Sequence, residues 1–116
     1  GNFADRSARD LLATTLKGYN DDYPVSAPTG QFTASPQGLF DLAGNVAEWC
    51  QDYYSIYSYK PDQVTVNPTG PAEGRHRIVR GSSFKHAGIS ELRSAYRDYS
   101  DDKRDDLGFR VCRYAE

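Results

Sequence analysis

The chain of 116 residues has no methionine, one tryptophan and two cysteines, and only 38% of its residues are apolar. A core is therefore possible but small. No apolar run approaches the ~18 residues of a membrane-spanning helix, which excludes insertion into a bilayer. The formal net charge of −2 lacks the basic excess with which proteins bind nucleic acid or anionic membranes. The length allows at most one domain.

Turn-forming residues are plentiful, with ten glycines and six prolines, and predict little regular structure. Apolar residues at helical spacing after Ser7 predict one helix over residues 7–17, although Thr14-Thr15 weakens it. A charged, solvated loop is predicted over 98–106. Strands are predicted over residues 46–53, 77–80, 92–97 and 108–114. The elements indicate an α+β chain that is irregular and rich in loops.

Residues 41–49, with the sequence DLAGNVAEW, place two carboxylates around a Gly-Asn turn and end in the only tryptophan. Together with residues 80–84 (RGSSF) and 108–110 (GFR), this motif resembles the formylglycine-generating-enzyme (sulfatase-modifying factor) family. The three motifs occur in that family's order. With them, the resemblance covers the chain from about Asn2 to Arg113. The resemblance implies a loop-rich variant of the C-type-lectin fold.

In this resemblance, Asn2 falls near the middle of the family domain. We therefore expect residues 1–116 to form the C-terminal portion of a single domain, and the fold to be partial. Such a portion exposes apolar surface where its companion would pack. The expected companion is the missing N-terminal half of the domain or a second copy of the chain.

A calcium ion takes about 6–8 oxygen ligands and needs a tightly folded backbone, which favours glycine. The resemblance implies calcium at the first motif, bound by the side chain of Asp41, the carbonyls of Gly44 and Val46, and Glu48. The alternative is that Asp41 caps a turn and Glu48 pairs with an arginine.

The resemblance implies a second calcium site near the start of the chain. Its ligands would be Asn2, the carbonyl of Phe3, Asp21 and the carbonyl of Tyr23, with Asp22 as an alternative to Asp21. The competing interpretation is that the acidic pair is simply solvated.

The family forms formylglycine by oxidising a substrate cysteine with copper that two enzyme cysteines hold, because soft thiolates bind Cu(I). The matching segment here, residues 85–91, contains no cysteine. His86 stands near the position of the first thiol, but a lone imidazole is a poor Cu(I) site. We therefore expect no copper and assign no catalytic residue. Oxidation of sulfatase cysteines remains the disfavoured alternative to a calcium-stabilised binding module.

The two cysteines, Cys50 and Cys112, fall in predicted strands. A disulfide between them would close a loop of about 60 residues, worth roughly 4 kcal/mol in the chain-entropy model. Such a bond would favour an extracytoplasmic location. The alternative is two buried free thiols that behave as small apolar groups.

A ligand face for a peptide or protein is predicted around residues 82–106. It includes the neighbouring tyrosine-rich loop of residues 53–59. Tyrosine offers broad contact area and a polar tip. The candidates are Tyr54, Tyr57, Phe84, His86, Tyr96, Arg97 and Tyr99.

Four arginines stand where the family places arginines, and we interpret them as structural, since guanidinium groups pair well with carboxylates. The alternative is that they hold a peptide or an anion. The arginines are Arg80, Arg93, Arg97 and Arg110, and their predicted partners are Glu48, Asp98 and Asp105.

A third interpretation of the function comes from residues 84–107, which are rich in Tyr, Ser, Asp and Arg. They resemble the display surface of variable proteins from diversity-generating retroelements, whose randomised residues precede a closing Gly-Phe-Arg.

Overall fold

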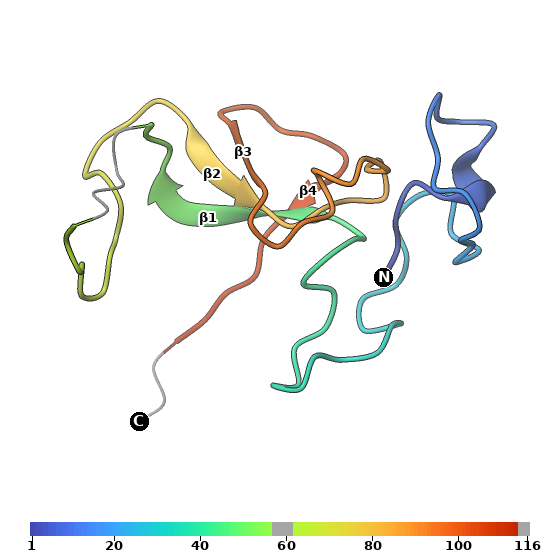
Figure 1. Cartoon of the computed structure of the whole chain (residues 1–116), viewed down its shortest axis with the longest axis horizontal. Helices are drawn as coiled ribbons and strands as arrows, with labels where there is room; N and C mark the ends of the chain where they lie inside the picture. The colour runs from blue at the N-terminus through green and yellow to red at the C-terminus, as the bar shows by residue number, and fades with distance from the viewer. Residues whose placement is uncertain (57–61, 114–116) are drawn as a thin grey trace.

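The computed structural model describes residues 1–56 and 62–113. Four short strands form one sheet in the order β3-β2-β1-β4 (Figure 1). Strand β2 pairs antiparallel with β1 and β3, whereas β4 pairs parallel with β1. The strands are β1 (Ala47–Tyr53), β2 (Arg77–Arg80), β3 (Arg97–Ser100) and β4 (Leu107–Gly108).

The predicted helix over residues 7–17 is wrong. The only helix among the described residues is the 3-10 turn η1 (Arg6–Ala8). Asp5, not Ser7, caps it, by accepting a hydrogen bond from the Ser7 N–H at 2.8 Å. The chain then folds back, and the Leu16 N–H donates to the Ala4 carbonyl at 2.7 Å. That return contact stops a helix from continuing, so the described residues contain no α-helix and the α part of the predicted class is not shown.

Two strands occur where the sequence predicts them, within one residue, at 46–53 and 77–80. The predicted strand over 92–97 is displaced, because β3 begins at Arg97. The predicted last strand over 108–114 is reduced to β4, which ends at Gly108, and Tyr114 lies outside the described residues. Beyond β4 the chain leaves the sheet and is exposed (Figure 1).

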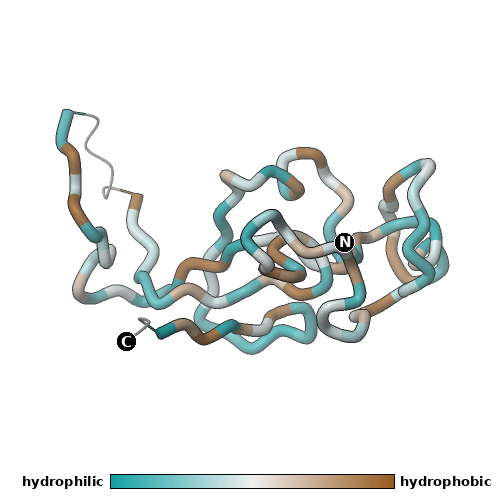
Figure 2. Tube along the Cα trace, turned by 90° about the horizontal axis from the view of Figure 1, so that it is seen from below, coloured by the Kyte–Doolittle hydropathy of each residue, from teal (hydrophilic) through white to brown (hydrophobic). Residues whose placement is uncertain are grey.

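The buried apolar core of the described residues is small. The chain exposes 9030 Å², whereas a compact protein of 13.0 kDa exposes about 6,300 Å² by size scaling. Hydrophobic residues also lie on outlying loops and near the C-terminus (Figure 2). The buried apolar residues are Ala4, Ala8, Ala27, Ala47, Val79 and Phe84.

No helix among the described residues is long and apolar enough to cross a membrane.

Candidate functional site

The segments that carry the motifs meet around Asn45, at the start of the sheet. The backbone N–H of Asn45 donates to the Asn2 carbonyl at 2.6 Å, and its carbonyl accepts from the Phe84 N–H at 2.8 Å. The buried Asn45 side chain makes two hydrogen bonds to the backbone of Ala27, at 2.8 and 3.1 Å. One residue therefore ties the N-terminal segment, the first motif and the RGSSF motif together.

Gly44 makes the close approach that this junction needs. Its N–H donates to both the carbonyl and the hydroxyl of Ser82, each at 3.1 Å. Its φ of +84° lies in the left-handed region, and an added Cβ would lie 2.4 Å from the Asn2 carbonyl oxygen. Only glycine fits at this position.

Asp41 and Glu48 line a hollow of about 390 Å³ beside the turn. One carboxylate oxygen of Asp41, Oδ2, accepts from the Gly30 N–H at 2.8 Å. The other, Oδ1, is buried and has no hydrogen-bond partner. A buried carboxylate oxygen without a partner is costly, and a bound cation would remove that cost. The Asp41 side chain therefore fits the calcium predicted at this motif.

Glu48 is paired with an arginine, as the alternative interpretation held. The Nε of Arg110 lies 3.0 and 2.7 Å from the two carboxylate oxygens of Glu48. The Nη2 atom of Arg110 also donates to the Phe40 carbonyl at 3.0 Å. The bond to Glu48 raises the pKa of Arg110, so this cation stays charged. A calcium ion at the turn would have to share Glu48 with Arg110.

The second predicted calcium site also contains an orphaned oxygen. Asn2 is 0% exposed, and its Nδ2 donates to the Val25 carbonyl at 2.6 Å while its Oδ1 has no partner. The Asp21 carboxylate accepts from the N–H groups of Phe3 and Tyr23 at 3.0 and 2.9 Å. Asp21 therefore faces the first residues of the chain, and of this pair only the Asn2 Oδ1 is left without a partner.

Neither site gathers three acidic, histidine or cysteine side chains, and no such metal-binding cluster occurs within residues 1–56 and 62–113. Both candidate sites depend on backbone carbonyls for their remaining ligands.

Asp5 was not predicted as a site residue, yet it is 0% exposed. Its carboxylate accepts from the N–H and hydroxyl of Ser7 at 2.8 and 2.6 Å, and from the Asp21 N–H. Burial raises the pKa of Asp5, but these hydrogen bonds outweigh burial and lower it overall. Burial, together with the nearby charge of Asp5, raises the pKa of Asp21. The only sequence signal for Asp5 was its position just before Arg6-Ser7, as a helix cap.

Replacing Asp5 with asparagine is expected to lower the free energy of unfolding at pH 7 by about 2 kcal/mol, because the charged acceptor is lost. A lowered pKa contributes stability above the ordinary aspartate value of about 4, and that contribution disappears as the pH falls through the folded-state pKa. Urea unfolding of both proteins at pH 7 and pH 3 measures this. An unchanged difference between the variants at the two pH values would contradict the role of the Asp5 charge.

The predicted ligand residues form two separate groups. His86 lies edge-on to Tyr96, with ring centroids 6.0 Å apart, and its Nδ1 accepts from the Ser83 N–H at 2.9 Å. Phe84, two residues before His86, is buried. Tyr54 and Tyr99 stack elsewhere, with centroids 4.4 Å apart. Tyr57 lies outside the described residues.

Asp106 was predicted to be part of a solvated loop, and this is wrong. It is buried and accepts from the Ser83 hydroxyl at 2.8 Å and from Arg104 Nε at 3.0 Å. Its carbonyl also accepts from the Ala47 N–H at 2.9 Å. Asp106 therefore joins the RGSSF motif to β1, and its place just before the closing motif was the only signal.

Of the four predicted arginines, all within the described residues, only Arg110 pairs with a predicted acid. Asp98 is held by Arg104 and Asp105 by Lys85. The other three arginines donate to backbone carbonyls: Arg80 to Ser94, Arg93 to Ser90 and Arg97 to Ala95.

Cys50 and Cys112 are both free thiols, so the structure does not form the predicted disulfide. Cys50 is half-buried in β1, whereas Cys112 is exposed on the segment that has left the sheet after β4. The pairing of β1 with β4 ends at Glu48 and Gly108, before either cysteine is reached.

Among curated proteins, a formylglycine-generating enzyme of Streptomyces coelicolor is 34% identical over 100 residues, which cover 83% of this chain and 32% of that protein. A serine/threonine-protein kinase, pkn1, of Chlamydia caviae is 41% identical over 73 residues, covering 62% of this chain and 12% of the kinase. The chain thus spans a third or less of these relatives.

Two solved structures share the fold. Treponema denticola variable protein 1 matches with a TM-score of 0.63 and 32% identity, over 73% of this chain and 31% of its own. PvdO from Pseudomonas aeruginosa matches with a TM-score of 0.63 and 27% identity, over 81% of this chain and 36% of its own. The chain spans about a third of each of these two structures.

The model of the FGE-sulfatase family, described as the sulfatase-modifying factor enzyme 1-like domain, matches residues 2–115. The match spans all three sequence motifs, and the chain belongs to this family.

Proposed function

We propose that the chain is a calcium-stabilised, non-catalytic member of the family that acts as a protein- or ligand-binding module. One observation carries the non-catalytic part. Residues 85–91, where the family holds copper with two cysteines, contain no cysteine. The imidazole of His86 in that segment already accepts a hydrogen bond from the Ser83 backbone. A single occupied imidazole is a poor ligand for Cu(I), which prefers thiolates.

The calcium part is supported by two buried oxygens without partners, Asp41 Oδ1 and Asn2 Oδ1. Each belongs to a set of ligands that the family resemblance implies. Calcium bound there would fasten the Gly44 turn to the N-terminal segment, which meets it at Asn45. Its role in this proposal is structural.

The exposed apolar surface supports a companion, either the rest of a larger domain or a second copy. Phe109 and Val111 are 74% and 86% exposed. Residues 39–42 lie beside them, because Arg110 donates to the Phe40 carbonyl at 3.0 Å. This surface includes three further exposed side chains, Leu39, Phe40 and Leu42. Large apolar side chains exposed on neighbouring segments are typical of an interface.

The purified chain is expected to leave a cysteine-containing sulfatase peptide unmodified in the presence of copper and oxygen, because no thiolate pair is available to bind Cu(I). Mass spectrometry of the peptide measures this. The formylglycine-generating enzyme of Streptomyces coelicolor is the positive control. An aldehyde product that depends on this chain would restore the oxidase alternative.

The likeness to Treponema denticola variable protein 1 favours a second candidate, a variable binding protein diversified by a retroelement. Residues 84–107 would then be the variable segment. A near-copy of this segment beside the gene, differing at adenines, would support this candidate, and its absence would remove it.

A further inference from the structure

Strands β1, β2 and β3 place three charged residues in one row on the face of the sheet opposite the buried Val79. Glu48 is paired in register with Arg80, and Arg80 with Arg97. Directly opposite residues on neighbouring strands project to the same face, with Cβ atoms about 5 Å apart. Two arginines side by side repel each other unless an anion lies between or beside them.

The only acid in this row does not neutralise the arginines. Both carboxylate oxygens of Glu48 accept from Arg110. Arg80 donates to the Ser94 carbonyl at 2.7 Å and Arg97 to the Ala95 carbonyl at 3.1 Å. Within the described parts of the chain, neither arginine has a carboxylate within salt-bridge distance, and the buried Nε of Arg80 has no partner. The row therefore carries positive charge and unused guanidinium donors.

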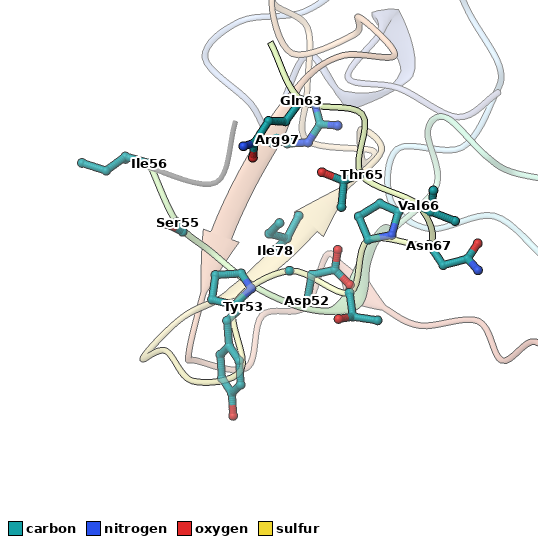
Figure 3. A pocket seen from close by; sticks show the side chains of 14 residues that line it. Asp52, Tyr53, Ser55, Ile56, Gln63, Thr65, Val66, Asn67, Ile78 and Arg97 are labelled. Atoms are coloured by element: carbon teal, nitrogen blue, oxygen red, sulfur yellow. The ribbon is translucent and has the colours of Figure 1, made fainter. Parts of the chain in front are cut away.

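A hollow of about 1140 Å³ lies against the same sheet, between it and residues 62–71 (Figure 3). Arg97, Ile78 and Asp52 line it on the sheet side, and Gln63 is among the residues that line it from the 62–71 segment (Figure 3). Residues 62–71 make no backbone hydrogen bond to another described residue. Their N–H and carbonyl groups are free to pair with an extended chain, as in strand addition.

We infer that this hollow binds an extended peptide through an acidic side chain, whose carboxylate is held by Arg97, with the charge of Arg80 beside it on the neighbouring strand. The inference deepens the proposed binding function and rests on it. The guanidinium fork of Arg97 matches a carboxylate with two hydrogen bonds, and the unneutralised charge of Arg80 beside it adds to the attraction. Ile78 supplies an apolar surface at the bottom of the hollow, between Arg97 and Asp52. The volume far exceeds that of a free phosphate or sulfate, which would leave this apolar surface and the loop backbone uncovered.

Among the described residues that line the hollow, Asp52 carries the only acidic side chain. It lies on β1, four residues beyond Glu48, and therefore away from the arginine end of the hollow. This difference in charge between the two ends sets the orientation of the bound peptide. The acidic residue of the peptide is excluded from this end by repulsion and belongs at the arginine end.

Selection of random peptides on the immobilised 116-residue chain tests this inference. Wild type is expected to enrich peptides with a central Asp or Glu, and replacing that acid with its amide is expected to weaken binding about tenfold. Arg97→Gln should abolish the preference, and Arg97→Lys should keep part of it because the charge remains. Arg9→Gln, which makes the same charge change on an exposed side chain, should bind like wild type. Melting temperatures confirm that each variant is folded.

Cys50 gives a second measurement, since the charges of Arg80 and Arg97 both act on its thiol. In Cys112→Ser, the selected acidic peptide should slow labelling of Cys50, whereas its amide version and inorganic sulfate at the same concentration should not. Two results would overturn the inference: peptides that bind without a preference for an acidic residue, or peptides that bind Arg97→Gln as tightly as wild type. Either result would leave the proposed binding function intact. Protection by sulfate alone would reduce the site to one for small anions. Failure to enrich any peptide would overturn both proposals.

Discussion

Replacing Gly44 with alanine is expected to cost about 3–5 kcal/mol, enough to unfold much of a marginally stable chain. Two effects add. A non-glycine residue at the left-handed φ of +84° costs about 1–2 kcal/mol. The new Cβ would also lie 2.4 and 2.9 Å from the carbonyl oxygen and nitrogen of Asn2. These are backbone atoms and cannot turn away, so the junction of the motifs must open.

Gly18 provides the matched control, because its φ of +78° is nearly the same and nothing lies within 4 Å of an added Cβ. Gly18→Ala should lose only the conformational part, about 1 kcal/mol. Urea unfolding followed by circular dichroism measures both variants. Equal losses at Gly44 and Gly18 would mean that the contact between the turn and Asn2 contributes nothing to stability.

Removing calcium with EDTA is expected to lower the melting temperature by roughly 10 °C or more. A ligand present at about 100 times its dissociation constant stabilises the folded state by about 2.7 kcal/mol. In a chain of this size, each kcal/mol shifts the melting temperature by roughly 4–8 °C. The physical source is the buried Asp41 Oδ1, which has no hydrogen-bond partner without a cation.

Asp41→Ala separates this effect from the general cost of a mutation. The variant should melt well below wild type in calcium but close to wild type in EDTA, because the orphaned carboxylate is costly without its cation. Asp10→Ala, on an exposed side chain, should behave like wild type in both buffers. A calcium response that survives Asp41→Ala would move the site elsewhere.

The sequence predicts the strands at 46–53 and 77–80 because their alternation is local and strong. It fails for residues 7–17, where the return contact from Leu16 to Ala4 overrides helical spacing. It also misplaces the last strand, because β4 is held by only two residues of parallel pairing with β1. Such long-range contacts leave no periodic signal.

The sequence identifies only part of the candidate site, because long-range contacts bring the other residues into it. The family pattern predicts the acids of the first motif and the Asn2–Asp21 pair as ligands, and these assignments remain predictions. Asp5 and Asp106 were not predicted as site residues, because their roles depend on partners that only the fold brings near. The opposition of Arg80 and Arg97 depends on strand register, which single residues do not reveal.

Native mass spectrometry of the chain, with and without EDTA, tests the central claim most directly. The account predicts a mass that carries one or two calcium ions, that loses them with EDTA, and that loses one of them in Asp41→Ala. A chain that binds no calcium at millimolar concentration, with the same melting temperature in EDTA, would contradict calcium stabilisation. The assignments of Asp41, Gly44, Val46, Glu48, Asn2, Phe3, Asp21 and Tyr23 as ligands would then be withdrawn.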